Sequence, residues 1–280
     1  MKLMSKHNII AWIVIIFSTL CLSYSCCLSS SRIGLISKRD ATHLKRNSFT
    51  LVEVSHSLIA TRCLGENDIC KDAPTGIEVR SMQARGSGVV VGHRREMTYI
   101  MTAGHVCEHR FPELVEFDGI SYATKPKTKI IFYDLYGASH SGIALYVDLD
   151  TDVCIVESKG TWGDAVEIAE EMPRHGERVF NIAAPFGIYS PQMVLLFEGY
   201  YSGTDMGGNE FFTIPCRPGS SGSPVFNSDG ELISIIHSAS PRFENLGLGS
   251  RLEIVRATIE AHVPAETDVT VHYIMLKETQ

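Results

Sequence analysis

The sequence predicts an all-β protein that ends in a single helix. Many short runs rich in Val, Ile, Tyr and Phe alternate with clusters of turn residues, which is the pattern of a β-sandwich or barrel. Only one late stretch, residues 251–262, repeats its apolar side chains at helical spacing, and Ser250 is placed to cap it. The repeated positions are Leu252, Val255 and Ile259. At 280 residues, of which 44% are hydrophobic, the chain can bury the core of one large domain or two small ones.

Four parts follow one another along the chain. Residues 1–28 form a leader, and residues 29–48, rich in Ser and basic residues and without periodicity, form a linker. Two β units are expected next, at 49–165 and 166–280, and the second includes the helix and a C-terminal tail. The polar stretch 160–176 is the predicted joint between them.

The leader contains an uninterrupted apolar run, residues 9–22, that follows Lys2 and Lys6. The run is short for a spanning helix and is typical of the core of a signal peptide. Extended to Leu28 it could instead span a membrane as an uncleaved anchor. Three basic residues would then mark its far boundary: Arg32, Lys38 and Arg39.

Lipid attachment is a third alternative for the leader, because Cys26 and Cys27 follow the apolar run and precede a Ser-rich spacer. The residues before Cys26 fit a lipoprotein cleavage box poorly, with Ser23 where Leu is expected. A buried helix of the main domain is disfavoured, since the run has no polar face. All three remaining alternatives place the bulk of the chain outside the cytoplasm, either secreted or anchored at a membrane.

Charge and cysteine spacing exclude two other kinds of partner. The net charge is −7 and no block of five or more like charges occurs, so we expect no nucleic-acid partner. No cysteine pair has metal-ligand spacing and the histidines are scattered, so we expect no metal and no cofactor. Five cysteines lie beyond the leader, an odd number, and Cys63 and Cys70 enclose a short polar loop that a local disulfide could close.

Two residues at strand edges could activate a nucleophile. His105, in T-A-G-H-V, closes an apolar strand beside the small residues Ala103 and Gly104, which leave its ring accessible as a general base. Asp152 stands immediately before the apolar strand V-C-I-V, where a half-buried carboxylate could orient the imidazole. Two nearby acids remain the alternative: Asp148 and Asp150.

The stretch P-G-S-S-G-S-P-V-F, residues 218–226, supplies the candidate nucleophile, Ser221. A tight turn can expose a hydroxyl and aim two backbone N–H groups at one point. Gly219 lies two residues before Ser221 and can take unusual dihedrals, so the N–H groups of Gly219 and Ser221 are the predicted oxyanion hole. Gly222 gives the substrate room to approach, and Ser220 and Ser223 are turn residues.

Residues 81–261 resemble the trypsin-like serine peptidases, and within them the HtrA-type and glutamyl-endopeptidase branches. The resemblance implies two packed antiparallel six-stranded β-barrels with the triad in the cleft between them. His105 and Asp152 would come from the first barrel and Ser221 from the second. The motifs that carry the resemblance are G-S-G-V-V-V, T-A-G-H-V, D-V-C-I-V, N-I-A-A-P-F-G and P-G-S-S-G-S-P-V-F-N-S-D-G-E-L-I-S-I.

The resemblance also implies where a polypeptide substrate binds. A peptide would lie as an added strand along residues 237–240, which include His237, Ser238 and Ala239. The pocket position six before Ser221 is Pro215, which is uncharged and argues against specificity for Arg or Lys. His237 falls one residue late for the histidine of a glutamyl endopeptidase, so its side chain should point to the opposite face. A small or apolar P1 residue is therefore expected.

The chain departs from the family in three places. Ser220 replaces the Asp that pairs with a newly cleaved N-terminus in digestive trypsin-like enzymes, so we expect no activation by that ion pair. The usual Cys beside the catalytic His is absent, since Cys107 lies one place further on and residues 89–91 offer it no partner. We also expect no PDZ-like domain after the helix.

The predicted function is that of a serine endopeptidase that acts outside the cytoplasm through a Ser-His-Asp triad and an acyl-enzyme. A catalytically silent, protease-shaped module that binds peptides at a membrane is the alternative, although such a module has no need of an intact triad. An esterase of the α/β-hydrolase type is excluded, because G-S-S-G-S lacks the second Gly of that elbow and the chain lacks βα alternation.

Overall fold

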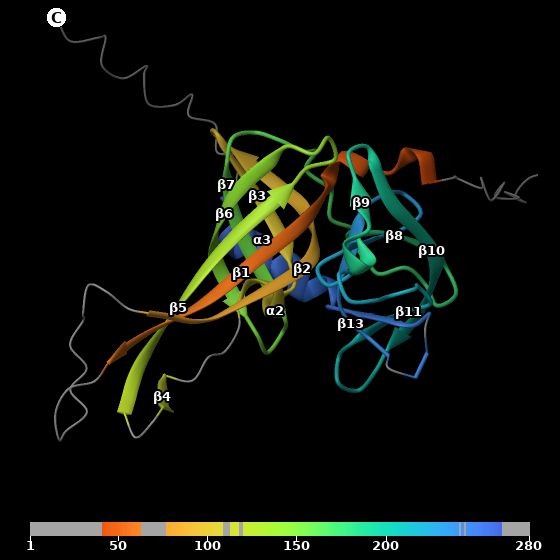
Figure 1. Cartoon of the computed structure of the whole chain (residues 1–280). Helices are drawn as coiled ribbons and strands as arrows, with labels where there is room; N and C mark the ends of the chain where they lie inside the picture. The colour runs from red at the N-terminus through yellow and green to blue at the C-terminus, as the bar shows by residue number, and fades with distance from the viewer. Residues whose placement is uncertain are drawn as a thin grey trace, which may run out of the picture. The chain divides into compact units, whose positions relative to one another are not determined.

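A computed structural model describes residues 41–62, 77–108, 113–117, 120–240, 242–243 and 245–264 (Figure 1). Two compact units, Met1–Thr42 and His43–Gln280, make up the chain, and the second holds all the elements that position the site. The leader, most of the predicted linker and the Cys63–Cys70 pair lie outside the described residues. No helix within the described ranges is long and apolar enough to cross a membrane.

The first barrel is built from long antiparallel strands. Their order is β1-β2-β3-β7-β6-β5, and pairing of β5 with β1 closes the ring at six strands, while β4 extends from β5. The barrel follows two 3₁₀ turns, η1 (Ala41–His43) and η2 (Arg46–Ser48). The strands are β1 (Phe49–Arg62), β2 (Ile77–Arg94), β3 (Met97–Thr102), β4 (Leu114–Phe117), β5 (Ile120–Tyr133), β6 (Ser139–Asp148) and β7 (Val153–Lys159).

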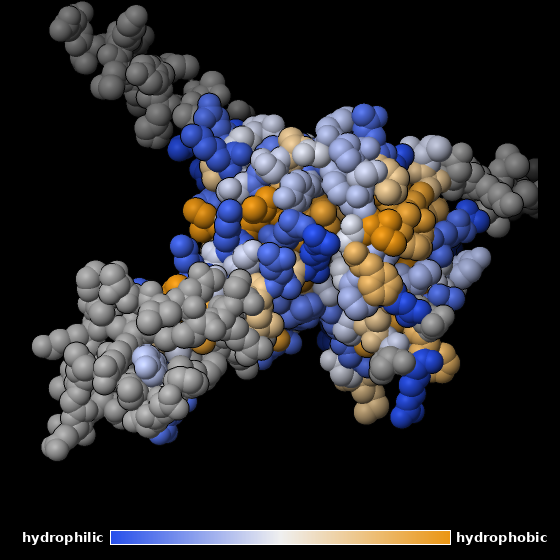
Figure 2. Space-filling model, viewed as in Figure 1, coloured by the Kyte–Doolittle hydropathy of each residue, from blue (hydrophilic) through white to orange (hydrophobic). Residues whose placement is uncertain are grey.

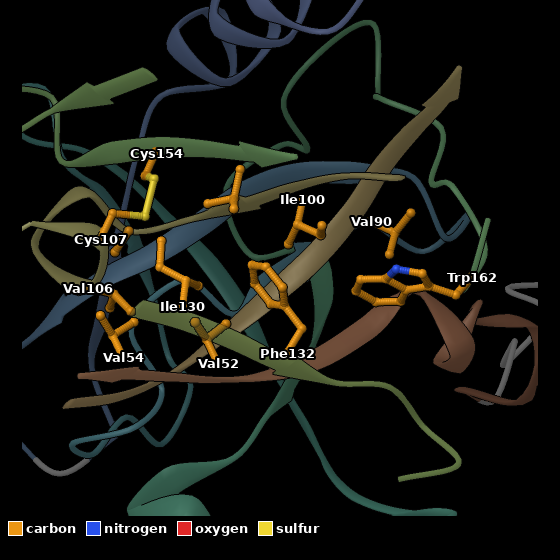
Figure 3. Packing of buried hydrophobic residues seen from close by; sticks show 12 residues of the cluster. Val52, Val54, Val90, Ile100, Val106, Cys107, Ile130, Phe132, Cys154 and Trp162 are labelled. Carbon is orange, nitrogen blue, oxygen red and sulfur yellow. A yellow bond between two sulfur atoms is a disulfide. The ribbon is translucent and has the colours of Figure 1, made fainter. Parts of the chain in front are cut away.

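The inward-facing residues of these strands form one apolar cluster (Figure 3). Phe132 from β5 is fully buried, and its ring lies 5.9 Å from the ring of Trp162, centroid to centroid. Trp162 lies at one end of the cluster, and a disulfide between Cys107 and Cys154 lies at the other (Figure 3). Burial of these side chains is the main stabilising contribution to the barrel.

The second barrel is closed in the same way from shorter strands. Its order is β11-β14-β13-β12-β8-β10, and β10 pairs with β11 to close the ring, while β9 adds to β10. The strands are β8 (Arg178–Ala183), β9 (Tyr189–Ser190), β10 (Met193–Thr204), β11 (Glu210–Phe212), β12 (Pro224–Phe226), β13 (Leu232–Ala239) and β14 (Gly247–Gly249). A 3₁₀ turn, η3 (Pro185–Gly187), follows β8.

The helix α3 (Leu252–His262) ends the described part of the chain and contacts both β7 and β13. It buries the three apolar positions that the sequence predicted: Leu252, Val255 and Ile259. Its N-cap is Arg251 and not Ser250, and no side chain caps the helix. The predicted fold class, two six-stranded antiparallel barrels with a C-terminal helix, is confirmed.

The two barrels lie side by side in Figure 1, with the short helix α2 (Gly104–Cys107) on the first. Between β7 and β8 the chain bonds to both barrels, since the Val166 N–H donates to Val90 O and the Ala169 N–H to Leu232 O. The domain boundary predicted at residue 165 falls in this segment and stays a prediction. On the face drawn in Figure 2, apolar residues gather in separate groups on a largely hydrophilic surface.

The disulfide joins Cys107 at the end of α2 to Cys154 in β7, across 47 residues of chain. The sequence predicted no partner for Cys107, because residues 89–91 in β2 contain no cysteine. The structure supplies the partner from the neighbouring strand of the closed barrel instead. Both cysteines are buried, at 3% and 0% exposure, so the bond is part of the core.

Removal of this disulfide should destabilise the protein without changing its fold. Because the bond restricts the unfolded chain, the combined changes Cys107→Ala and Cys154→Ala should lower the free energy of unfolding by about 2–4 kcal/mol. Urea unfolding followed by fluorescence measures the loss. The control is Cys216→Ala, which removes a buried thiol that forms no disulfide. A double variant that is no less stable than this control would contradict the prediction.

Candidate active site

His105 is presented by a short helix at the end of a strand. β3 ends at Thr102, Ala103 keeps an extended backbone, and α2 begins at Gly104. The helix lies close to the β6–β7 turn, since a Cβ on Gly104 would lie 2.5 Å from the Asp148 carbonyl oxygen. The side chain of His105 is 48% exposed, so its ring borders solvent as the sequence predicted.

The Asp152 carboxylate accepts hydrogen bonds from both the ring and the backbone of His105. The ring Nδ1 lies 2.8 Å from Oδ2 and 3.0 Å from Oδ1 of Asp152, and the backbone N–H of His105 donates to Oδ1 at 2.8 Å. Burial acts to raise the pKa of Asp152, but the hydrogen bonds from His105 outweigh it and hold the pKa below its ordinary value. The carboxylate is therefore ionised at neutral pH and fixes the position of the imidazole.

The structure distinguishes between the three acids that the sequence left open. Asp148 accepts hydrogen bonds from the backbone N–H groups of Asp150 and Thr151, at 2.8 and 3.2 Å, so its carboxylate organises the turn. Asp150 is exposed. Asp152 ends the turn with φ +53°, a left-handed conformation that Asp tolerates better than most residues, and its side chain meets His105.

Ser221 reaches the same imidazole from the second barrel. Its Oγ lies 2.9 Å from Nε2 of His105. Because a carboxylate only accepts hydrogen bonds, Nδ1 carries the proton toward Asp152, and Nε2 is left to accept the hydroxyl proton of Ser221. The structure therefore brings together the three residues predicted to form the triad.

The loop that ends in Ser221, residues 218–221, has a hydrogen-bond donor for each of its carbonyl groups. All four carbonyl oxygens accept hydrogen bonds, and trans peptide geometry then points the N–H of the same peptide unit the opposite way. The Gly219 and Ser221 N–H groups have no acceptor among the described residues. The donors are Phe186 N to Pro218 O (2.6 Å), Ser87 Oγ to Gly219 O (2.8 Å), Ser223 N to Ser220 O (3.0 Å) and Ser87 N to Ser221 O (2.8 Å).

Two glycines make this loop geometry accessible. Gly219 has φ +98°, and a Cβ there would lie 2.5 Å from the Ala184 carbonyl oxygen. Gly222 has φ +84° and packs against Ser87 and Thr102 with no room for a side chain. Both positions require the conformational freedom of glycine. The two N–H groups predicted to form an oxyanion hole are thus both left without an acceptor among the described residues.

A cavity of about 300 Å³ opens beside Ser221. Ser238 and Ala239 line it, as predicted, together with Cys216 and Ile236. Pro215 precedes Cys216 but is not among the lining residues. Burial raises the pKa of the Cys216 thiol to about 12, so the thiol is uncharged, while the neighbouring Arg217 adds a cationic residue to the lining.

His237 lies elsewhere. Its side chain lines a separate cavity of about 230 Å³ together with Asp152 and Arg251. The register of β13 against β14 shifts between Ile236 and Ser238, yet His237 still does not line the cavity beside Ser221. Burial lowers the pKa of His237, and the nearby Asp152 carboxylate offsets only part of this.

Ser87 and Phe186, whose groups hold the loop that ends in Ser221, were not predicted as site residues from the sequence. Their motifs, G-S-G and A-A-P-F-G, were recognised only as parts of a family pattern. Phe186 has φ +55°, which is unusual for an aromatic residue and marks its turn as constrained. Within the described ranges, no group of three or more His, Cys, Asp or Glu side chains is placed to hold a metal ion.

Known proteins similar to this chain include a plant protein and a bacterial protein of known structure. The chain is 25% identical over 197 residues to a protein of Arabidopsis thaliana described as protease Do-like 14. The match covers 67% of this chain but only 43% of the plant protein. A solved structure, the serine endoprotease from Yersinia pestis, superposes with a TM-score of 0.54 at 18% identity. That match covers 80% of this chain and 65% of the other, and it shows the fold.

The family model of the trypsin-like peptidase domain matches residues 86–235, which is more than half of the chain. This range holds Ser221, His105 and Asp152. The Do-like relative agrees with the HtrA-type resemblance of the sequence. The chain therefore belongs to the trypsin-like peptidase domain family.

Proposed function

We propose that the protein cleaves polypeptides as an active serine endopeptidase, with Ser221 as nucleophile, His105 as general base and Asp152 as the group that orients the imidazole. One observation carries the proposal: an unbroken hydrogen-bonded series from Ser221 Oγ through His105 to Asp152, at 2.9 and 2.8 Å. A serine hydroxyl becomes a useful nucleophile only when such a base accepts its proton.

The geometry supports the following sequence of steps. Ser221 Oγ attacks the carbonyl carbon of the scissile bond while its proton moves to Nε2 of His105, and Asp152 stabilises the imidazolium. His105 then gives this proton to the leaving amine, the C–N bond breaks and an acyl-enzyme remains. Water, deprotonated by the same nitrogen, attacks the ester and regenerates the Ser221 hydroxyl.

The charge that develops on the carbonyl oxygen needs donors that are already in place. The N–H groups of Gly219 and Ser221 supply them. The carbonyl oxygens of the same two peptide units, Pro218 O and Ser220 O, are each held by a hydrogen bond, so each N–H points the opposite way from its bonded carbonyl. Preorganised donors cost no reorganisation at the moment of reaction and are among the largest contributions to catalysis. The loop is thus in an orientation suited to the transition state.

The cavity beside Ser221 supports a small or apolar P1 residue. Its walls include the neutral Cys216 thiol and the apolar Ile236, and Arg217 also lines it. Ser238 and Ala239, at the end of β13, are placed for the substrate backbone to lie along them as an added strand.

We also propose that this chemistry takes place outside the cytoplasm. The Cys107–Cys154 disulfide supports this compartment, because such bonds form and persist in oxidising environments. The apolar run at residues 9–22 supports it from the sequence, as a signal peptide or membrane anchor.

The role of the nucleophile can be tested directly. Ser221→Ala should lower kcat by about 10⁴- to 10⁶-fold, because the triad acts as a unit. A fluorophosphonate probe should label the wild-type protein at Ser221 and leave the variant unlabelled. The control, Ser228→Ala, changes an exposed serine in a turn of the same barrel and should keep full activity. Equal casein cleavage by Ser221→Ala and wild type would refute the proposal, and absence of labelling in folded wild-type protein would favour a silent binding module.

Two neighbouring acids provide a matched test of the orienting group. Asp152→Asn keeps the shape of the side chain but removes the charge that holds the imidazole, so kcat should fall by about 10³- to 10⁴-fold. Asp150→Asn makes the same change on an exposed residue of the same turn and should leave kcat within about twofold of wild type. Peptide hydrolysis by both variants under identical conditions measures the difference. Comparable losses in the two would show that Asp152 has no special role.

A further inference from the structure

Ser87 on β2 connects the first barrel to the catalytic loop of the second. Its side chain is fully buried. The hydroxyl donates to Gly219 O at 2.8 Å and accepts from the Ala184 N–H at 3.0 Å. The Ser87 backbone N–H donates to Ser221 O at 2.8 Å, and its carbonyl oxygen accepts from the Thr102 hydroxyl at 2.8 Å. One residue therefore contacts the nucleophile loop, the turn after β8 and the end of the strand that leads to His105.

The hydroxyl of Ser87 holds the carbonyl oxygen of the peptide unit that follows Gly219. The unit before Gly219 is held by the Phe186 N–H, which donates to Pro218 O at 2.6 Å. The unit after it is held at both ends, since Ser87 Oγ donates to Gly219 O and the Ser220 N–H donates to Arg217 O, each at 2.8 Å. Together these bonds set both dihedrals of Gly219, and hence the direction of its N–H.

Gly219 needs this restraint more than any other residue type would. A glycine moves between distant backbone conformations at little cost, so a free peptide unit beside it could rotate. Rotation of either unit would turn a carbonyl oxygen or a misdirected N–H toward the developing oxyanion. The fixed φ of +98° therefore depends on the bonds to both peptide units, and Ser87 supplies the one that comes from the other barrel.

We propose that Ser87 is a positioning residue for the oxyanion hole, and that through it the docking of the two barrels sets the catalytic geometry. The inference rests on the proposed peptidase function and deepens it. Ser87 does not touch the substrate. It acts through Gly219 and, by the Ala184 bond, ties that loop to the turn that carries Phe186.

A purely structural role would have a different signature. A buried serine that only satisfies backbone groups should affect folding when it is removed, and kcat should follow the fraction of folded protein. A positioning role should lower the turnover of fully folded protein, while ground-state binding of the substrate persists. Ser158 provides a matched comparison, since it is 1% exposed and its Oγ donates to a backbone carbonyl, Ser141 O, at 2.9 Å in the first barrel.

The test compares Ser87→Ala with Ser158→Ala in the full chain. Circular dichroism and thermal unfolding measure the fraction of folded protein in each variant. Ser87→Ala should lower kcat by about 10- to 100-fold, below the loss caused by complete removal of an oxyanion donor. KM should change by less than about threefold. Ser158→Ala should keep kcat within about twofold of wild type even where it unfolds at a lower temperature.

Inhibitor binding separates positioning from structure more sharply. A peptidyl trifluoromethyl ketone forms a tetrahedral adduct whose oxyanion occupies the hole, whereas the product peptide leaves the hole without charge. Ser87→Ala should weaken the ketone by about the same factor as kcat/KM and leave the product peptide unchanged. Equal weakening of both ligands, or a kcat no lower than that of Ser158→Ala, would overturn the inference.

A second variant keeps the test decisive if Ser87→Ala fails to fold. Ser87→Cys keeps a group of similar shape but a weaker hydrogen-bond donor and acceptor, so kcat should fall while KM holds. A Ser87→Cys protein with wild-type kcat would also overturn the inference. If instead wild-type protein neither cleaves peptides nor reacts with a fluorophosphonate, the proposed function fails and not the role of Ser87 alone.

Discussion

The site depends on the contact between the nucleophile turn of the second barrel and strand β2 of the first. The Ser87 N–H donates to Ser221 O at 2.8 Å, and Gly222 packs so closely against Ser87 and Thr102 that no side chain would fit there. This contact places Ser221 Oγ 2.9 Å from His105. Since the histidine and the nucleophile belong to different barrels, no local turn could hold them at that distance. Packing of the barrels must do so.

The first barrel holds its half of the site rigidly. His105 and Asp152 are joined by three contacts between 2.8 and 3.0 Å, one of them from the backbone N–H. The disulfide adds a covalent link two residues after each of them, between Cys107 and Cys154. Helix α2 therefore cannot separate from β7 without breaking core packing. The imidazole is oriented before any substrate arrives, which lowers the cost of reaching the transition state.

Local signals in the sequence were sufficient for an all-β chain with one late helix and for three candidate side chains, whereas the two-barrel arrangement was predicted from the resemblance to trypsin-like peptidases. His105 and Asp152 each stand at the edge of an apolar strand, and Ser221 stands in a turn with glycines on both sides. Features that depend on barrel closure were not accessible in this way. Cys107 and Cys154 are 47 residues apart and become neighbours only when β3 pairs with β7. Ser87 looks like any small strand residue until the second barrel docks on it, and the cap at Ser250 was wrong by one residue.

A crystal structure of the protein after reaction with a fluorophosphonate tests the central claim most directly. Phosphonylation at Ser221 should place the phosphoryl oxygen about 2.7–3.1 Å from the backbone nitrogens of both Gly219 and Ser221. The hydrogen bond from Ser87 Oγ to Gly219 O should persist in the adduct. An adduct on another residue, or a Gly219 N–H directed away from the phosphoryl oxygen while Ser87 keeps its bonds, would contradict the account.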